Sequence, residues 1–261
     1  MMTNASLRAV TKKLGSGLLK RQILVKNRIL VGTHHKTGTV WFANIFRDIS
    51  SRLGLRFVRS PDERFPPDGW DIFQNSHSAF DLPKLGQFRG LHVIRDPRDQ
   101  IISATFYHEK SAEAWLHVRM DEFGGMTYQE KINSFSCFDD KMLFEMEHSA
   151  YHNIMSMKEF DHTDERFLTA RFEELITDYK LEKFEQIFRF LGFRRVVVGW
   201  CLVAAYRNSL FSGAVESTHV RSGKPKQWPE YFKPIHRNRF EELFGDVLQK
   251  LGYDEEWESI D

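Results

Sequence analysis

A lysine, a glycine and two threonines lie close together in the stretch VGTHHKTGTVWF, residues 31–42. The first N–H groups of a helix have no partner and carry a partial positive charge, so they bind anions. The threonine hydroxyls would add further donors here, and Lys36 would add a full charge. The segment predicts an anion site, although a plain strand-to-helix turn capped by Thr-Gly-Thr fits it equally well. The residues expected to supply the N–H groups are Thr37, Gly38, Thr39 and Val40.

This stretch differs from the usual nucleotide-triphosphate loop, which reads G-x-x-x-x-G-K-[ST]. In this chain Gly32 is followed by Lys36 and only then by Gly38, so the lysine and the second glycine come in the opposite order. A small-molecule kinase of the P-loop class is therefore an alternative function that the order of these residues argues against.

A second candidate anion site lies in HVIRDPRDQIISATFYH, residues 92–108. Arg95 ends an apolar run, and Ser103 follows eight residues later on a predicted helix. A guanidinium group binds two phosphate oxygens at once, and a serine hydroxyl can bind a third. The other interpretation is that Arg95 pairs with Asp96 or Asp99 and that Ser103 only packs.

A third basic segment, HVRSGKPKQWPEYF, covers residues 219–232. Its glycine and prolines predict a loop. Its cations, among them Arg221, could form a solvated face. Alternatively, Trp228 and Phe232 would anchor the loop as a lid.

The elements that must position these residues alternate between strand and helix. The apolar patterns predict strands at 28–34, 71–77, 89–96 and 166–172, and helices at 39–54, 97–107 and 175–191. Such alternation is typical of an α/β fold, here a three-layer sandwich with a mainly parallel sheet. Ligands of these sheets lie beyond the carboxyl ends of the strands. Residues 34–39, His77 and Arg95 would all lie there.

Composition excludes several functional classes. The net charge of +1 over 261 residues argues against a nucleic-acid binder. No apolar run approaches the roughly 20 residues that span a bilayer. Cys137 and Cys201 form no metal or disulfide pattern, so we expect a cytoplasmic protein. The basic segment 1–27 could touch a membrane surface peripherally.

His148 and His152 are four residues apart, the spacing of two metal ligands on a helix, but the H-E-x-x-H pattern is missing. A surface helix face is therefore favoured, and no metal is expected.

Four motifs together resemble the family of sulfotransferases that depend on 3′-phosphoadenosine-5′-phosphosulfate (PAPS), in its cytosolic and bacterial type. HKTGTVW is similar to the family's 5′-phosphosulfate loop, and VIRDPRDQIISATFY to its 3′-phosphate element. RSGKPKQWPEYF resembles its late R-K-G loop, and ARFEELITD its Y-E-D-L segment. The resemblance spans residues 28–252 as a single domain with a P-loop NTPase-like fold, followed by a tail at 253–261.

The resemblance implies transfer of a sulfuryl group from PAPS to a hydroxyl, or less often an amine, of a small-molecule, lipid or sugar acceptor. It implies adenosine 3′,5′-bisphosphate (PAP) as the product and no metal. Lys36 would stabilise the leaving phosphate, and Trp41 would stack on adenine unless it is a core residue. The implied donor-binding residues are Lys36, Thr37, Gly38, Thr39, Val40, Trp41, Arg95, Ser103, Tyr206, Arg221, Ser222 and Gly223.

The family's small-molecule branch ends a strand in K-T-H, and the matching N-S-H makes His77 the implied catalytic base. A loop histidine bonded to its serine neighbours is the alternative, as is a carboxylate base such as Glu109. Three departures, Asn75 for lysine, Phe172 for tyrosine and Ser222 for lysine, also keep open a non-catalytic, nucleotide-binding relative. We expect the acceptor to contact a flexible, partly apolar lid at residues 110–138.

Overall fold

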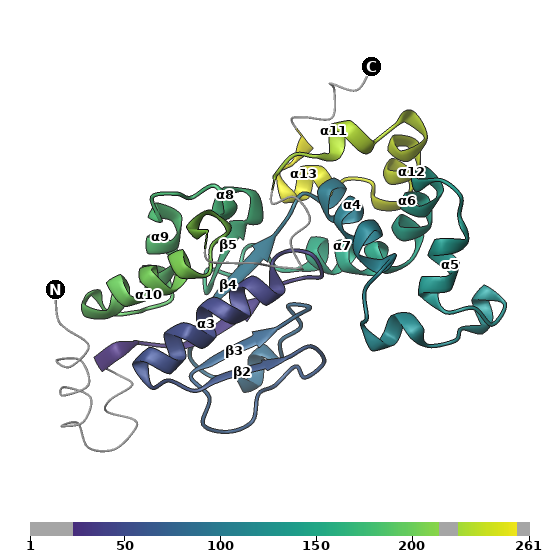
Figure 1. Ribbon diagram of the computed structural model, residues 1–261. Coiled ribbons are helices and arrows are strands. Elements are labelled where there is room, and N and C mark those ends of the chain that lie inside the picture. The colour runs from purple at the N-terminus through teal and green to yellow at the C-terminus, as the bar shows by residue number, and fades with distance from the viewer. Residues whose placement is uncertain (1–22, 214–223, 255–261) are drawn as a thin grey trace.

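A computed structural model of the chain describes residues 23–213 and 224–254. Its centre is a five-stranded sheet in which every pairing is parallel, with the order β2-β3-β1-β4-β5 (Figure 1). This confirms the predicted α/β class. The strands are β1 (Arg28–Gly32), β2 (Phe57–Ser60), β3 (Ile72–Asn75), β4 (Phe88–Ile94) and β5 (Phe167–Arg171).

The edge strand β2 was not predicted from the sequence. Its four residues, FVRS, are too short to show an alternating pattern, and none of them is fully buried. An edge strand pairs on one side only, so its sequence carries a weak hydrophobic signal. The predicted strands also end early, β1 at Gly32 and β3 at Asn75, which leaves the polar residues after them in loops.

One face of the sheet is covered by α3 (Thr39–Leu53), α9 (Glu182–Phe190) and α10 (Arg195–Arg207). Helix α3 buries Phe42, Ile45, Phe46, Ile49 and Leu53 against the strands. It ends at Gly54, whose φ of 65° is the left-handed conformation that glycine tolerates. The predicted bounds of this helix are confirmed.

The helix predicted at 175–191 is wrong as a single element. The structure divides it into α8 (Phe172–Ile176) and α9, with Leu181 at a φ of 60° between them. The Asp178 carboxylate accepts hydrogen bonds from the N–H groups of Glu182 (2.9 Å) and Phe184 (3.0 Å). A carboxylate that caps the start of α9 forces a new helix there, which apolar spacing alone does not reveal.

The opposite face of the sheet packs on an aromatic cluster that includes Trp70, Phe80 and Phe167. Beyond the carboxyl end of β4, a helical group surrounds a core of methionines and phenylalanines (Figure 1). It consists of α4 (Pro97–His108), α6 (Phe138–Glu147), α7 (Ser149–Glu159), α11 (Trp228–Tyr231), α12 (Pro234–Phe244) and α13 (Val247–Leu251).

The predicted lid at 110–138 has structure of its own. It contains two short 3₁₀ turns (Ala114–His117 and Asp121–Phe123) and helix α5 (Tyr128–Ser134). Together with Phe144, these elements enclose an apolar cluster of Leu116, Phe123, Tyr128 and Ile132. Two further 3₁₀ turns lie at Leu82–Lys84 and Leu210–Ser212. Among the residues that the structure describes, no helix is both long and apolar enough to cross a membrane.

Candidate active site

The parallel register brings the ends of β1 and β3 to one level, and β4 continues slightly farther, to Ile94. Gly32 at the end of β1 lies opposite Asn75 of β3 and His92 of β4. The loops that follow these strands therefore meet at the carboxyl edge of the sheet, as predicted. A side chain on Gly32 would collide with Ser78, whose Oγ would lie 2.6 Å from the new Cβ, so glycine allows the loops after β1 and β3 to pack closely.

The loop after β1 is fixed by the carbonyl of His34. This carbonyl accepts hydrogen bonds from the hydroxyls of Thr37 and Thr39, both at 2.9 Å. The Thr37 hydroxyl also accepts from the His34 N–H at 2.8 Å. In this structure the two hydroxyls thus hold the loop rather than point at a ligand, so an anion would be bound mainly by backbone N–H groups.

Those N–H groups belong to the first turn of α3. Its N-cap is Gly38, with a φ of 93°, and no side chain of the described residues caps the helix. Lys36 also adopts a positive φ, 65°. Alternating left-handed residues turn successive N–H groups to one side, which forms an anion-binding concavity. A Cβ on Gly38 would lie 3.1 Å from the Phe172 ring and would fill this turn.

Lys36 projects its ammonium group over the ring of Tyr107, with Nζ 3.7 Å from the ring centroid. Burial, and then the neighbouring charge of Arg95, lowers the pKa of Lys36 to about 8. Among the described residues no carboxylate pairs with this ammonium group, and its pKa is lowered, so an incoming anion would stabilise it.

Arg95 joins the two predicted anion sites. Its guanidinium donates to the Lys36 carbonyl at 2.8 Å and lies over the Phe172 ring at 4.9 Å. Its Nε is buried and has no hydrogen-bond partner among the described residues. Arg95 forms an ion pair with neither Asp96 nor Asp99. Asp96 pairs with Arg98 instead, at 2.8 Å. Ser103 lies on α4, half-buried.

Asp99 connects α4 to the late basic segment. Its Oδ1 accepts from the N–H groups of Gln227 and Trp228, both at 2.9 Å. Trp228 and Phe232 are buried in the core of the helical group, which fixes the described end of this segment. The predicted ligands Arg221, Ser222 and Gly223 lie outside the described residues.

His77, the predicted base, lies in the turn after β3 with an exposed side chain. The buried Asn75 builds this turn: its Oδ1 accepts from the N–H groups of His77 and Ala79, both at 2.9 Å. Its amide nitrogen donates to the carbonyl of Glu63 at 3.0 Å. The asparagine that stands in place of the family's lysine therefore shapes the loop that carries His77.

The two predicted adenine contacts have different surroundings. Trp41 is half-buried between Phe172 and Phe184, at ring distances of 5.9 and 5.7 Å, and its buried indole N–H has no partner in the described part of the chain. Tyr206 is 47% exposed at the end of α10, near Phe211.

Sequence reasoning missed a buried hydrogen-bonded chain that starts at His35. The Nε2 of His35 lies 3.1 Å from that of His108, and the Nδ1 of His108 lies 2.8 Å from Glu145. Tyr128 donates its hydroxyl proton to the same carboxylate oxygen at 2.9 Å. These partners come from α4, α6 and α5, so only the tertiary fold brings them together. Two adjacent histidines before the lysine were the available signal.

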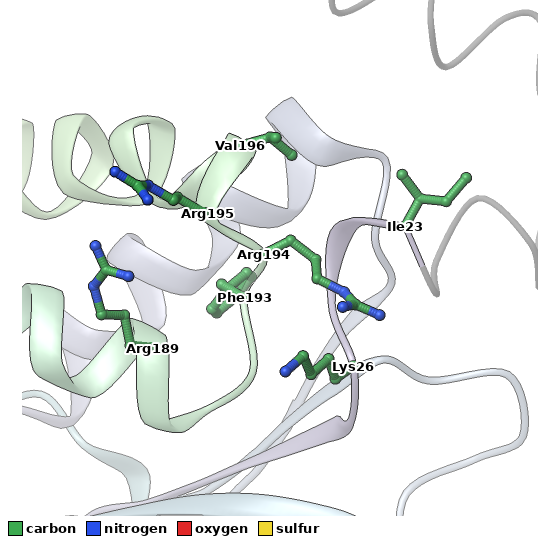
Figure 2. Close-up of a pocket in the computed structure, with 7 residues that line it drawn as sticks. All are labelled: Ile23, Lys26, Arg189, Phe193, Arg194, Arg195 and Val196. Atoms are coloured by element: carbon green, nitrogen blue, oxygen red, sulfur yellow. The ribbon is translucent and has the colours of Figure 1, made fainter.

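The cavity shown in Figure 2 lies away from this site, where the chain enters β1. Its volume is about 690 Å³. The cavity is therefore near the amino end of strand β1, whereas Lys36 follows the carboxyl end of that strand. Its lining residues are Ile23, Lys26, Arg189, Phe193, Arg194, Arg195 and Val196. Within the described residues, no group of three or more histidine, cysteine or acidic side chains could hold a metal ion. His148 bonds the carbonyl of Phe144 instead.

Comparison with known proteins identifies the fold and then the family. The mouse sulfotransferase SULT7A1 complexed with PAP superposes with a TM-score of 0.57 at 17% identity, covering 85% of this chain and 84% of that one. Retinol dehydratase with androsterone and inactive cofactor PAP gives a TM-score of 0.53 at 15% identity, covering 85% and 80%. These likenesses confirm the predicted sulfotransferase-type, P-loop-like fold.

No curated protein sequence matches the chain. The family model of the sulfotransferase domain matches residues 72–252, well over half of the chain, and the protein therefore belongs to the sulfotransferase family.

Proposed function

We propose that this sulfotransferase transfers the sulfuryl group of PAPS to the hydroxyl of an apolar acceptor and releases PAP. The observation that carries the proposal is the junction between Lys36 and Arg95, where the Arg95 guanidinium donates to the Lys36 carbonyl at 2.8 Å. Two cations from separate loops thus lie near each other at the carboxyl edge of the sheet. The donor has an anionic group at each end of its adenosine, which would use both.

The residues present fit such a donor. The buried Nε of Arg95 has no partner in the described chain, and the N-terminus of α3 has no side-chain cap. Burying a donor without an acceptor is unfavourable, so both features favour a bound anion. The N–H groups of Gly38, Thr39 and Val40 would bind the 5′-phosphate. The N–H of Thr37 was also expected to do so, but it donates to the His34 carbonyl at 3.1 Å. Arg95 and Ser103, with Arg221, Ser222 and Gly223, would bind the 3′-phosphate.

In the reaction, the oxygen of the acceptor hydroxyl bonds to sulfur while the bond from sulfur to the bridging phosphate oxygen breaks. Lys36 would stabilise the negative charge that gathers on that leaving oxygen, an electrostatic contribution that acts mainly in the transition state. His77 would remove the hydroxyl proton. Its exposed ring lies near the Lys36 loop, since His77 is the last of the neighbours that, after burial, contribute to the lowered pKa of His35.

The acceptor would lie against Tyr107 and Trp115. Tyr107 carries the Lys36 ammonium on its ring, and Trp115 is 40% exposed. Aromatic walls beside a few convergent polar groups are typical of sites for small apolar ligands. Retinol dehydratase has been solved with androsterone and with retinol, and we propose an acceptor of that apolar, hydroxylated kind for this protein.

Isothermal titration calorimetry with PAP tests the donor site, with magnesium ATP as the comparison ligand. We expect PAP to bind at micromolar concentration or tighter, and Lys36→Ala and Arg95→Ala each to weaken it by about 10- to 100-fold, because each removes a charge-assisted bond. Lys84→Ala, a substitution at an exposed lysine, is the matched control. A preference for magnesium ATP, or PAP binding that survives both substitutions, would overturn the proposal.

His77 is tested separately, by turnover. His77→Ala should keep PAP affinity and lose about 10²-fold or more in rate, the usual contribution of a general base. An unchanged rate would remove His77 from the mechanism.

A further inference from the structure

A chain of buried ionisable side chains ends beside Lys36. Glu145 and His108 are completely buried and Tyr128 is 3% exposed, whereas His35 is half-buried. Their polar atoms lie 2.8 to 3.1 Å apart, so the chain is continuous from the carboxylate to the His35 ring. The mechanism proposed above uses none of these four groups.

Stability alone does not explain why Glu145 is buried. It lies next to the apolar cluster of Leu116, Phe123 and Ile132, and its second oxygen, Oε1, has no partner among the described residues. Moving a carboxylate out of water is strongly unfavourable, and buried ion pairs can often be replaced by apolar residues without loss of stability. A buried carboxylate that is left half-satisfied therefore points to a functional role.

The hydrogen-bond network assigns the protons along the chain. With an ionised Glu145, which can only accept, and a neutral His108, the His108 proton is on Nδ1 and a lone pair is on Nε2. That lone pair accepts from His35, which must therefore carry its proton on Nε2. The free lone pair of His35 is then on Nδ1. When one imidazole nitrogen is held by a hydrogen bond, the other nitrogen keeps its lone pair. This arrangement prepares a histidine to accept a proton.

His35 is also well placed. It directly precedes Lys36, and its ring centroid lies 5.7 Å from that of Tyr107, the ring that carries the Lys36 ammonium. Its half-buried ring is nearly parallel to that of His108, at an interplanar angle of 19°. Burial, with the nearby charge of Lys36 as a further cause, lowers the pKa of His35 well below its usual value, which keeps it neutral.

We propose that His35 is a second base for the acceptor hydroxyl, beside His77, and that His108 and Glu145 are its positioning residues; this rests on the proposed sulfuryl transfer. As the oxygen–sulfur bond forms, the hydroxyl proton moves to Nδ1 of His35. The proton on Nε2 of His35 moves to His108, whose cation is paired with the Glu145 carboxylate. The electron pair of the broken bond leaves with PAP, and the stored proton returns to water after release.

The proton positions can be measured directly by nitrogen-15 NMR of the histidine rings in the full chain bound to PAP, with His35→Gln and His108→Gln used for assignment. We expect a protonated Nε2 and a bare Nδ1 on His35. Glu145→Gln should mix the two tautomers, because an amide no longer dictates which nitrogen of His108 is protonated. A proton on Nδ1 of His35, or a His35 spectrum that Glu145→Gln leaves unchanged, would overturn the proposal.

Turnover tests the catalytic step, with PAPS as donor and phenol or p-nitrophenol as acceptor. Glu145→Gln should keep PAP affinity but slow transfer by about 10- to 100-fold, as for other partners that orient a reacting group. The loss should be larger for phenol, because the more acidic p-nitrophenol needs less help from a base. Glu147→Gln, on the same helix but in a surface pair with Arg239, is the matched control.

The double variant His35→Gln/His77→Ala should lose the turnover that remains in His77→Ala. Equal losses for both phenols in Glu145→Gln would show that the chain is merely structural and would overturn the inference. Absence of PAP binding in the unmodified protein would instead refute the proposed function. If neither phenol is sulfated, the NMR tautomers still decide whether His35 is prepared to accept a proton.

Discussion

At the scale of single residues, the Lys36 ammonium group has no carboxylate partner in the part of the chain that the structure describes. Its Nζ lies over an aromatic ring, and burial lowers its pKa to about 8. An anionic ligand favours the charged form, so binding should raise this pKa again. The ordinary protonation state of Lys36 should therefore depend on whether the donor site is occupied.

We predict that PAP binding takes up protons at pH 8. Close to half of the Lys36 side chains are neutral in the free protein at that pH, and each must gain a proton in the complex. Calorimetric titrations in two buffers of different ionisation enthalpy measure this uptake. It should fall toward zero at pH 6.5, where Lys36 is already charged. PAP affinity should decline as the pH rises above 8.

Lys36→Arg separates charge from geometry in the same experiment. A guanidinium remains protonated throughout this range, so the proton uptake at pH 8 should disappear while some PAP binding remains. Uptake that persists in Lys36→Arg would assign it to another group and contradict the prediction.

At the scale of elements, helix α4 positions two parts of the site at once. Its N-terminus follows Arg95, and Asp99 in its first turn accepts from the N–H groups of Gln227 and Trp228. The late basic segment is thereby attached to the helix that carries Ser103. A buried donor without an acceptor destabilises a protein by about 1–3 kcal/mol. Because the Asp99 carboxylate accepts from both N–H groups, it stabilises the protein and also holds the late segment in position.

Asp99→Ala should weaken PAP by about tenfold, the loss expected of one such bond, and leave AMP affinity nearly unchanged. The physical reason is that the late segment would serve the 3′-phosphate, which AMP lacks. Titration of both nucleotides measures the difference. Asp99→Asn keeps an acceptor oxygen and should retain most of the PAP affinity, and the exposed Asp62→Ala is the control. Equal losses for PAP and AMP would contradict this division of roles.

The same elements show which features the sequence could predict. Helix α3, with apolar residues at helical spacing and Gly54 just after it, was predicted to within one residue of its end at Leu53. Helix α9 was not separated from α8, because the break depends on the Asp178 carboxylate and the left-handed Leu181. The spacing of apolar residues indicates which face of a helix is buried. It does not indicate hydrogen bonds such as those of the Asp178 carboxylate, which determine where a helix begins.

The site divides in the same way. Lys36, Arg95 and Ser103 were predicted because each follows or occupies a recognisable strand or helix. The chain from His35 through His108 to Glu145 was missed because its members are 73 and 37 residues apart along the sequence. Their common feature is a tertiary position that no local pattern records.

At the scale of the whole molecule, a pair of buried histidines joins the loop after β1, which carries His34, to strand β4, which carries His92. The Nε2 atoms of His34 and His92 are 2.8 Å apart, and neither side chain is exposed. Burial lowers the pKa of His34 to about 3 and that of His92 well below its ordinary value. Both rings are neutral when folded at neutral pH, and His92 also packs face to face on Phe160 at 3.7 Å.

Folding therefore opposes protonation of these rings, which should make the protein sensitive to acid. The stability linked to a lowered pKa is complete above 6.5, the unfolded value, and is lost as the pH falls toward about 3. Between pH 7 and pH 5, each such histidine should reduce the free energy of unfolding by about 2 kcal/mol.

Urea denaturation at pH 7, 6 and 5 measures how steeply the free energy of unfolding falls. His92→Gln, which keeps a hydrogen-bonding group but cannot titrate, should shrink the decline by about that amount. The exposed His152→Gln should leave it unchanged. Identical declines in the unmodified protein and His92→Gln would mean that the buried pair does not set its acid stability.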